Sequence, residues 1–205
     1  MMQDTNFGYS DTVMDHFSNP RNVLKTSEEE YSPSGVGMVG NPTCGDMMKV
    51  WIKVDETERI YDLKWKTFGC ASAIGSTSMM SVMVTENGGM KVEDALKIKP
   101  ENIMDRLGGL PSIKIHCSVL GDKALRAAIN DYFTKSGQEG RILEKKAKII
   151  CECLNVTDHE IEEQVLEGAA DFETLQERTK ISTGCGKCRS TAIETFEHYR
   201  AKYFG

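Results

Sequence analysis

The sequence predicts an α+β fold, in which a small antiparallel sheet with helices packed on it precedes a smaller, mainly α-helical domain. Three observations predict this arrangement. Residues 48–66 alternate between apolar and polar side chains, as half-buried strands do; apolar residues at helical spacing follow them; and residues 149–205 carry helix-capping patterns with almost no strand pattern. A chain of 205 residues is long enough for one or two such domains.

A β-hairpin is predicted at residues 48–66. Its two strands are joined by a polar turn from Asp55 to Arg59. Because side chains alternate between the two faces of a strand, one face of each strand is expected to be buried. The residues expected on that face are Met48, Val50, Ile52 and Val54 in the first strand and Tyr61, Leu63 and Trp65 in the second.

Helices are predicted on both sides of the hairpin. Ser10 can cap a helix from Asp11 to Phe17, which stops at Asn19-Pro20 because proline restricts the residue before it. The polar, glycine-rich segment from Leu24 to Gly40 is expected to be a mobile loop. Further helices are expected at 71–85, 92–98, 100–107 and 118–133.

Turn-forming and charged residues separate the two predicted domains. Residues 136–140 contain two glycines, and residues 144–148 are mostly charged, a composition typical of linkers. The predicted boundaries are a first domain at 1–137, a linker at 138–148 and a second domain at 149–205.

The second domain is predicted to be mostly helical. Thr157 and Glu160 match a capping box, and Asp171 can cap the next helix. A last helix is expected from Lys187 to Tyr203. So small a domain with so little sheet buries only a thin core, and a bound metal would therefore help it to fold.

Charge and hydropathy exclude several function classes. The 25 basic and 31 acidic residues give a net charge of −6, so the chain lacks the basic surface that nucleic acids and anionic membranes attract. No apolar run approaches the ~18 residues of a membrane-spanning helix, and the N-terminus lacks the basic and apolar regions of a secretory signal. We therefore expect a cytoplasmic protein with no nucleic-acid or membrane partner.

Seven cysteines are the most informative part of the composition. In a reducing compartment, a cysteine-rich sequence usually serves metal binding or redox chemistry. Four thiolates hold either a tetrahedral zinc ion or a [2Fe–2S] cluster, and the Cys-x-Cys spacing is less typical of zinc. Backbone N–H groups around Gly184 and Gly186 would stabilise the negative charge of a cluster. The last four cysteines form two close pairs, Cys151 with Cys153 and Cys185 with Cys188.

The other three cysteines, Cys44, Cys70 and Cys117, lie far apart, each at the edge of a predicted element. Their thiols could converge on one face, where Asp46 or His116 would supply a fourth ligand. The spacing equally allows them to be separate small residues of the core, which is the usual place of a lone cysteine. Spacing alone leaves both interpretations open.

Two parts of the chain resemble known families. Residues 147–205, in which each cysteine pair precedes a helix, resemble the bacterioferritin-associated ferredoxin domain, which holds a stable [2Fe–2S] cluster. Residues 9–132 resemble the iron–sulfur scaffold family of the IscU/NifU type. Four motifs in order carry that likeness: YSD, H and NPRN within 9–22, NPTCGD at 41–46, KTFGCASA at 66–73 and KIHCS at 114–118. An IscU-like domain followed by a bacterioferritin-associated ferredoxin-like domain is the arrangement of NifU-type proteins.

The resemblance implies an iron–sulfur cluster assembly scaffold rather than an enzyme. In this family, Cys117 would accept sulfur from a cysteine desulfurase, and a transient [2Fe–2S] cluster would form with iron and pass to apo-proteins. The resemblance is compatible with a role in nitrogen fixation or in general iron–sulfur cluster assembly. It also implies a homodimer. The implied residues are Cys44, Asp46, Cys70, His116 and Cys117 for the transient cluster, iron or zinc, and Cys151, Cys153, Cys185 and Cys188 for a permanent [2Fe–2S] cluster, which could supply electrons.

The donor set of the first site suits a cluster that is given away. Iron–sulfur clusters prefer thiolates, so three sulfurs with a carboxylate or an imidazole hold a cluster less firmly than four sulfurs. A protonated His116 would also favour the thiolate form of Cys117.

We also consider two alternative functions. In the first, both sites hold zinc and the protein is a structural adaptor. In the second, Cys117 is the nucleophile of an enzyme with a histidine as its base. The neighbouring His116 is poorly placed for that role, because side chains at adjacent positions diverge in helices and strands.

The sequence departs from the family pattern in two places. A segment that a DnaK-type chaperone reads in the family usually contains two prolines, and the second is replaced here, which removes a fixed φ angle. The third domain of longer NifU proteins, with its own Cys-x-x-Cys, has no counterpart in this sequence. The segment that matches the chaperone motif consists of Leu110, Pro111, Ser112, Ile113 and Lys114.

Overall fold

The chain divides into two compact units, residues 1–142 (unit 1) and 143–205 (unit 2), each of which is described by itself. The structure, a computed structural model, describes residues 9–40, 47–110, 115–142 and 147–204, and only the backbone at 115–118. Across these ranges, no helix is long and apolar enough to cross a membrane.

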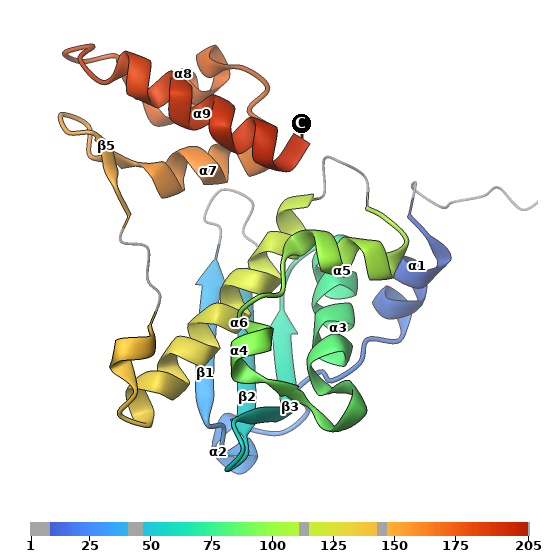
Figure 1. The fold of residues 1–205 in the computed structure, drawn as a ribbon. Coiled ribbons are helices and arrows are strands. Elements are labelled where there is room, and N and C mark those ends of the chain that lie inside the picture. The colour runs from blue at the N-terminus through green and yellow to red at the C-terminus, as the bar shows by residue number, and fades with distance from the viewer. Residues whose placement is uncertain (1–8, 41–46, 111–114, 143–146, 205) are drawn as a thin grey trace, which may run out of the picture. The chain divides into compact units, whose positions relative to one another are not determined.

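Unit 1 is a four-stranded antiparallel sheet in the order β1-β2-β3-β4, with helices packed against it, which confirms the predicted α+β class (Figure 1). The strands are β1 Gly35–Gly40, β2 Met47–Val54, β3 Arg59–Thr67 and β4 Met90–Lys91. The helices are α1 Asp11–Ser18, α2 Glu28–Tyr31, α3 Ala71–Thr85, α4 Val92–Ala95, α5 Pro100–Leu107 and α6 Ile115–Lys135.

The predicted hairpin is β2 and β3, but one of its inward residues was predicted wrongly. Tyr61 is 50% exposed, whereas Ile60 is fully buried. The pairing register explains the difference: Lys53 lies opposite Asp62, and Val54 lies opposite Ile60, so Tyr61 is the extra residue of a bulge. An extra residue reverses the alternation of side chains beyond it.

The segment from Leu24 to Gly40 was expected to be a mobile loop, and the structure corrects this expectation. It contains α2 and the edge strand β1. A Cβ atom on Gly35 would lie 2.2 Å from the carbonyl oxygen of Ala128, and one on Gly37 would lie 2.1 Å from that of Ala124. These glycines are therefore needed for the close approach of β1 to the backbone of α6.

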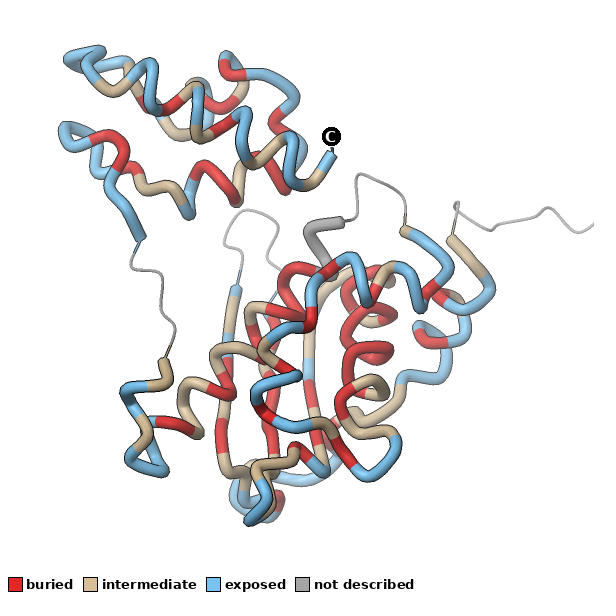
Figure 2. The backbone as a smooth tube through the Cα atoms, in the orientation of Figure 1, coloured by how far each residue is buried: buried red, intermediate tan, exposed pale blue. Residues whose placement is uncertain are grey.

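The main core lies between the sheet and helices α3 and α6 (Figure 2). Its largest fully buried side chains include Phe133, Ile52 and Leu125. On the opposite face of β2, Trp51 is buried in a smaller cluster with Leu24 and Tyr31. Burial on both faces explains why β2 is buried at three successive positions rather than in strict alternation.

The last residues of unit 1 are fastened to its hairpin. The guanidinium of Arg141 lies 4.5 Å from the centre of the Phe133 ring, and its Nη1 pairs with the Glu58 carboxylate in the turn between β2 and β3. Arg141 Nη2 is also 3.4 Å from the Glu93 carboxylate. Arg141 thus joins three segments of unit 1.

Unit 2 is mostly helical, as predicted, and its predicted caps are formed. Thr157 Oγ1 accepts a hydrogen bond from the Glu160 N–H (3.2 Å), and the Glu160 carboxylate accepts one from the Thr157 N–H (2.8 Å). Asp171 Oδ1 accepts from the Thr174 N–H at 2.8 Å. The elements are β5 Ile149–Cys151, β6 Val156–Thr157, α7 Asp158–Leu166, α8 Phe172–Thr179 and α9 Arg189–Phe204.

Candidate cluster-binding sites

The four cysteines of unit 2 line one cavity of about 260 Å³, and we call them the four-cysteine site. The Sγ atom of Cys153 lies 3.7 Å from that of Cys151 and 3.7 Å from that of Cys185. Two thiolates bound to one tetrahedral metal with bonds of ~2.3 Å are ~3.8 Å apart, so these spacings suit ligands of a shared metal. None of the four is in a disulfide.

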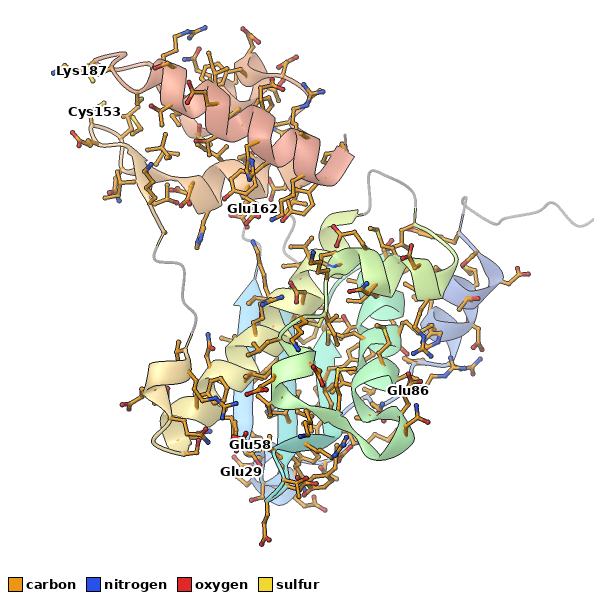
Figure 3. The ribbon with its side chains drawn as sticks, viewed as in Figure 1. Glu29, Glu58, Glu86, Cys153, Glu162 and Lys187 are labelled. Carbon is orange, nitrogen blue, oxygen red and sulfur yellow. The ribbon has the colours of Figure 1, made fainter. Side chains whose placement is uncertain are left out.

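Two short segments bring these sulfurs together. Cys151 is the buried last residue of β5, and the exposed Cys153 follows in the turn toward β6. The exposed Cys185 and the half-buried Cys188 precede α9, and Cys188 Sγ is 3.2 Å from the Ser182 hydroxyl. Figure 3 shows Cys153 at the same end of unit 2 as Lys187.

Glycine makes room for the sulfurs. A Cβ atom on Gly184 would lie 3.1 Å from Cys153 Sγ, closer than almost all real contacts. Gly186 has a φ of +72°, in the left-handed region that favours glycine. The two glycines that flank Cys185 in the sequence thus have separate roles, one steric and one conformational.

Backbone N–H groups around the cavity favour thiolates. The N–H of Ser182 is the main cause that lowers the pKa of Cys151 below its usual value, and the N–H of Lys187 does the same for Cys185. For Cys153, the N–H of Cys185 also lowers the pKa, but the neighbouring thiols and burial together outweigh it and raise the pKa. Two of the four sulfurs are therefore prepared to carry negative charge, which metal binding requires.

The donor set fits a [2Fe–2S] cluster. Within the ranges that the structure describes, no three His, Cys, Asp or Glu side chains are arranged to hold one metal ion. The sulfur–sulfur contacts of the four-cysteine site run from Cys153 to Cys151 and from Cys153 to Cys185. Four thiols in one cavity are nevertheless the ligands that such a cluster uses.

The elements of unit 1 that flank Cys44, Cys70 and Cys117 in the sequence meet at one end of the unit, and we call these three residues the three-cysteine site. Gly40 at the end of β1 pairs with Met47 at the start of β2, and Met48 pairs with Thr67 at the end of β3. Figure 1 shows the tips of β1 and β3 at the same end of unit 1 as the starts of α3 and α6. Cys70, at the N-cap of α3, and the backbone of Cys117, in the first turn of α6, therefore lie at this end.

The structure describes the members of this site to different extents. Cys70 is the half-buried N-cap residue of α3, and its carbonyl accepts the Ile74 N–H at 3.0 Å. His116 and Cys117 lie in the first turn of α6, where the backbone alone is described. Cys44 and Asp46 lie outside the described residues.

The segment that matches the chaperone motif lies mostly outside the described residues as well. Leu110 is described, and it is partly buried against the main core. Residues 111–114 are not described.

Sequence reasoning did not indicate that His16 is buried. It is 6% exposed, and its Nδ1 lies 2.8 Å from the Ser78 hydroxyl of α3. Burial lowers its pKa, and Arg21 adds to this effect while Asp15 opposes it. The one signal in the sequence that could have indicated a buried polar partner for His16 is the serine and threonine content of α3.

Comparisons with known proteins match both units of the chain to protein families. The profile of the NifU-like N terminal domain family matches residues 8–139, and that of the BFD-like [2Fe-2S] binding domain matches residues 149–198. Over 136 residues, the chain is 51% identical to the iron-sulfur cluster assembly scaffold protein IscU 1 of Archaeoglobus fulgidus, which covers 66% of this chain and 84% of that protein.

Two further relatives extend over more of the chain. The scaffold protein IscU of Aquifex aeolicus is 42% identical over 170 residues, which are 82% of this chain and 97% of that protein. The nitrogen fixation protein NifU of a Nostoc species is 35% identical over 184 residues, which are 88% of this chain and 60% of that protein. The chain therefore spans about 60% of the length of this NifU relative.

The fold of unit 1 and the cysteines of unit 2 define a scaffold of iron–sulfur cluster assembly, a class of proteins that are not enzymes. The chain belongs to the NifU-like N terminal domain family, which it joins to a BFD-like domain. The resemblance to the IscU/NifU type is thus confirmed.

Proposed function

We propose that unit 1 assembles a transient [2Fe–2S] cluster on Cys44, Cys70 and Cys117, bordered by Asp46 and His116, and passes it to apo-proteins. The observation that supports this proposal is that β1, β2, β3, α3 and α6, the elements that flank the three cysteines in the sequence, begin or end at one common end of unit 1. The names of the relatives, which are cluster assembly scaffolds, support the same conclusion.

Sulfur would enter through Cys117. Its thiolate attacks the outer sulfur of a persulfide on a cysteine desulfurase, which forms a Cys117 persulfide and releases the donor's thiolate. Each transferred sulfur then takes two electrons from a reductant to become the sulfide of the cluster. The position of Cys117 in the first turn of α6 supports its role as acceptor, because the positive end of the helix dipole favours a thiolate.

The strength with which each unit holds iron would differ. Cys44, Cys70 and Cys117 need a fourth ligand, and a carboxylate from Asp46 or an imidazole from His116 binds iron less firmly than a thiolate. A cluster held this way is suited to transfer. The four-cysteine site has sulfur ligands only and would retain its cluster.

In unit 2, Cys151, Cys153, Cys185 and Cys188 would hold a resident [2Fe–2S] cluster. Such a cluster supplies one-electron transfer when it is bound. The N–H groups of Ser182 and Lys187 would stabilise negative charge on its sulfur ligands, because they already lower the pKa of Cys151 and Cys185. The position of all four cysteines around one cavity supports this assignment.

The decisive experiment measures iron, acid-labile sulfide and zinc in anaerobically purified full-length protein. A second sample carries serine at the three cysteines of unit 1, and a third carries serine at the four of unit 2. We expect about two irons to resist a chelator in the parent and in the unit 1 variant, and none to resist it in the unit 2 variant. After reconstitution with a cysteine desulfurase, only proteins with the unit 1 cysteines should gain additional, chelator-sensitive iron.

The competing function is a zinc adaptor. Zinc without acid-labile sulfide in the parent would establish that alternative and exclude a resident cluster in unit 2. Zinc in unit 1 alone would not, because the same ligands can hold zinc before a cluster is built. For that unit, the deciding result is whether sulfide and iron added by the desulfurase reach an apo-ferredoxin.

A further inference from the structure

Two adjacent hydroxyl groups at the start of the described chain reach two different helices. The hydroxyl of Tyr9 lies 2.7 Å from that of Ser72, which is fully buried. The hydroxyl of Ser10 donates to the carbonyl oxygen of Leu107. Ser10 also accepts a hydrogen bond from the Val13 N–H at 3.1 Å and so caps α1.

The two contacts involve α3, which begins after Cys70, and α5, which packs on α6. Ser72 is the second residue of α3, and Cys70 is the N-cap of that helix. Leu107 is the last residue of α5, and residues 108–114 join it to α6, which carries Cys117. Helices α3, α5 and α6 contact one another, so a shift between α3 and α5 would also change the setting of α6.

The turn after α5 packs closely on the same point. Gly108 caps α5 with a φ of +75°, and a Cβ atom placed there would lie 3.5 Å from Cβ of Ser10. Ser10 thus contacts the end of α5 through its hydroxyl, and a side chain at Gly108 would pack against its Cβ atom. The backbone of residues 9 and 10 is consecutive, so the two hydroxyl contacts hold α3 and the end of α5 at a fixed separation.

We propose that Tyr9 and Ser10 act together as positioning residues of the scaffold: the two hydroxyls hold the start of α3, which follows Cys70, and the end of α5, which packs on α6, at the separation that cluster assembly requires. This inference rests on the proposed function of unit 1. Neither residue is a ligand. Their effect is to keep α3 and α6, the helices of Cys70 and Cys117, in a fixed arrangement before iron and sulfur arrive, which lowers the ordering cost of assembly.

Two substitutions remove one contact each and little else. Tyr9→Phe keeps the ring and loses the hydroxyl. Ser10→Asp keeps the cap of α1, because a carboxylate accepts the Val13 N–H well, but it has no hydrogen to donate to Leu107. Since both contacts are needed to fix one separation, breaking either one releases it. The double variant should therefore behave like each single variant, which is a strongly non-additive result.

The test uses the full chain and two measurements. The first is the rate at which chelator-sensitive iron leaves the reconstituted protein. The second is the yield of a Cys70–Cys117 cross-link in the apo-protein, formed by a short thiol-reactive cross-linker and mapped by mass spectrometry. We expect each single variant and the double variant to lose iron faster and to cross-link less, both by about two- to ten-fold, the factor that matches one net hydrogen bond.

Matched controls are Tyr61→Phe, at an exposed tyrosine, and Ser27→Asp, at the residue that caps α2 by accepting the Glu30 N–H. Neither should change either measurement. If Tyr9→Phe and Ser10→Asp match these controls, or if their effects multiply in the double variant, the positioning role is wrong. If instead the parent protein neither gains chelator-sensitive iron nor forms the cross-link, the proposed function of unit 1 is itself wrong.

Discussion

Cys153 and Cys185, 32 positions apart in the sequence, hold their sulfur atoms 3.7 Å from each other. The contact joins the turn after β5 to the segment before α9, so a shared metal would bind the two ends of unit 2 together. Since the binding energy of a structural metal contributes directly to folding, the four-cysteine site should support the stability of unit 2 as well as its redox chemistry.

Replacing Cys185 tests that link. In Cys185→Ser, we expect loss of the iron that resists a chelator and a lower unfolding temperature for unit 2, because one ligand and its bridge are removed. Iron analysis and thermal unfolding followed by circular dichroism measure the two effects. Cys70→Ser, in unit 1, is the control and should leave both unchanged. Full retention of iron by Cys185→Ser would remove Cys185 from the ligand set.

Gly37 should not tolerate a side chain. A Cβ atom there would lie 2.1 Å from the carbonyl oxygen of Ala124, so Gly37→Ala forces β1 away from α6. We expect a loss of about 1–3 kcal/mol in the free energy of unfolding of unit 1, the usual cost of overpacking. Gly140→Ala is the matched control, because nothing lies within 4 Å of its Cβ position. Equal denaturant midpoints for the two variants would contradict the close packing of β1 on α6.

His16 should make unit 1 less stable in mild acid. Burial lowers its pKa in the folded protein below the ~6.5 of the unfolded chain, so the unfolded state binds more protons in between. Stability is then fully present above pH ~6.5 and falls as the pH drops toward the folded pKa. Denaturant midpoints of unit 1 measured from pH 7.5 to 5.5 should show this slope, and it should be smaller in His16→Asn. The exposed His198→Asn serves as the control and should keep the slope of the parent.

Asp46→Ala should make the transient cluster more persistent. Loss of a hard carboxylate near three thiolates removes the weakly binding donor that favours release. The expected result is a slower loss of chelator-sensitive iron and a slower transfer to an apo-ferredoxin, both followed by visible absorbance. The exposed Asp94, which pairs with Lys97, offers a control in Asp94→Ala. An unchanged rate in Asp46→Ala would end the argument that a mixed donor set causes lability.

Much of the fold could be predicted because its causes are local. The capping of α1 by Ser10 and the capping box of Thr157 and Glu160 involve residues within three positions of each other. The parts that were predicted wrongly have distant causes. Gly35 and Gly37 look like loop residues until α6 is packed on them, and His16 looks solvated until Ser78, 62 positions later, is placed beside it.

The two candidate sites also differ in how far they could be predicted from local sequence. The pairs Cys151–Cys153 and Cys185–Cys188 are close in sequence, so their spacing alone indicated a metal, although the N–H contribution of Ser182 could not be foreseen. The three-cysteine site depends on the register of β1, β2 and β3 and on the packing of α6. No local pattern encodes the proposed convergence of its three cysteines, which is why only a family resemblance could indicate the site.

The attachment of Arg141 determines how the first unit can be studied alone. Its guanidinium covers the ring of Phe133 and neutralises the acid of Glu58 at the hairpin turn. A recombinant fragment that ends at Gly137 would expose the ring of Phe133 and leave the Glu58 carboxylate without its counter-ion. A fragment that extends to Ile142 keeps both contacts of Arg141. Spectroscopy of an isolated assembly unit should therefore be carried out on the longer fragment, so that a labile cluster is not mistaken for the effect of a frayed end.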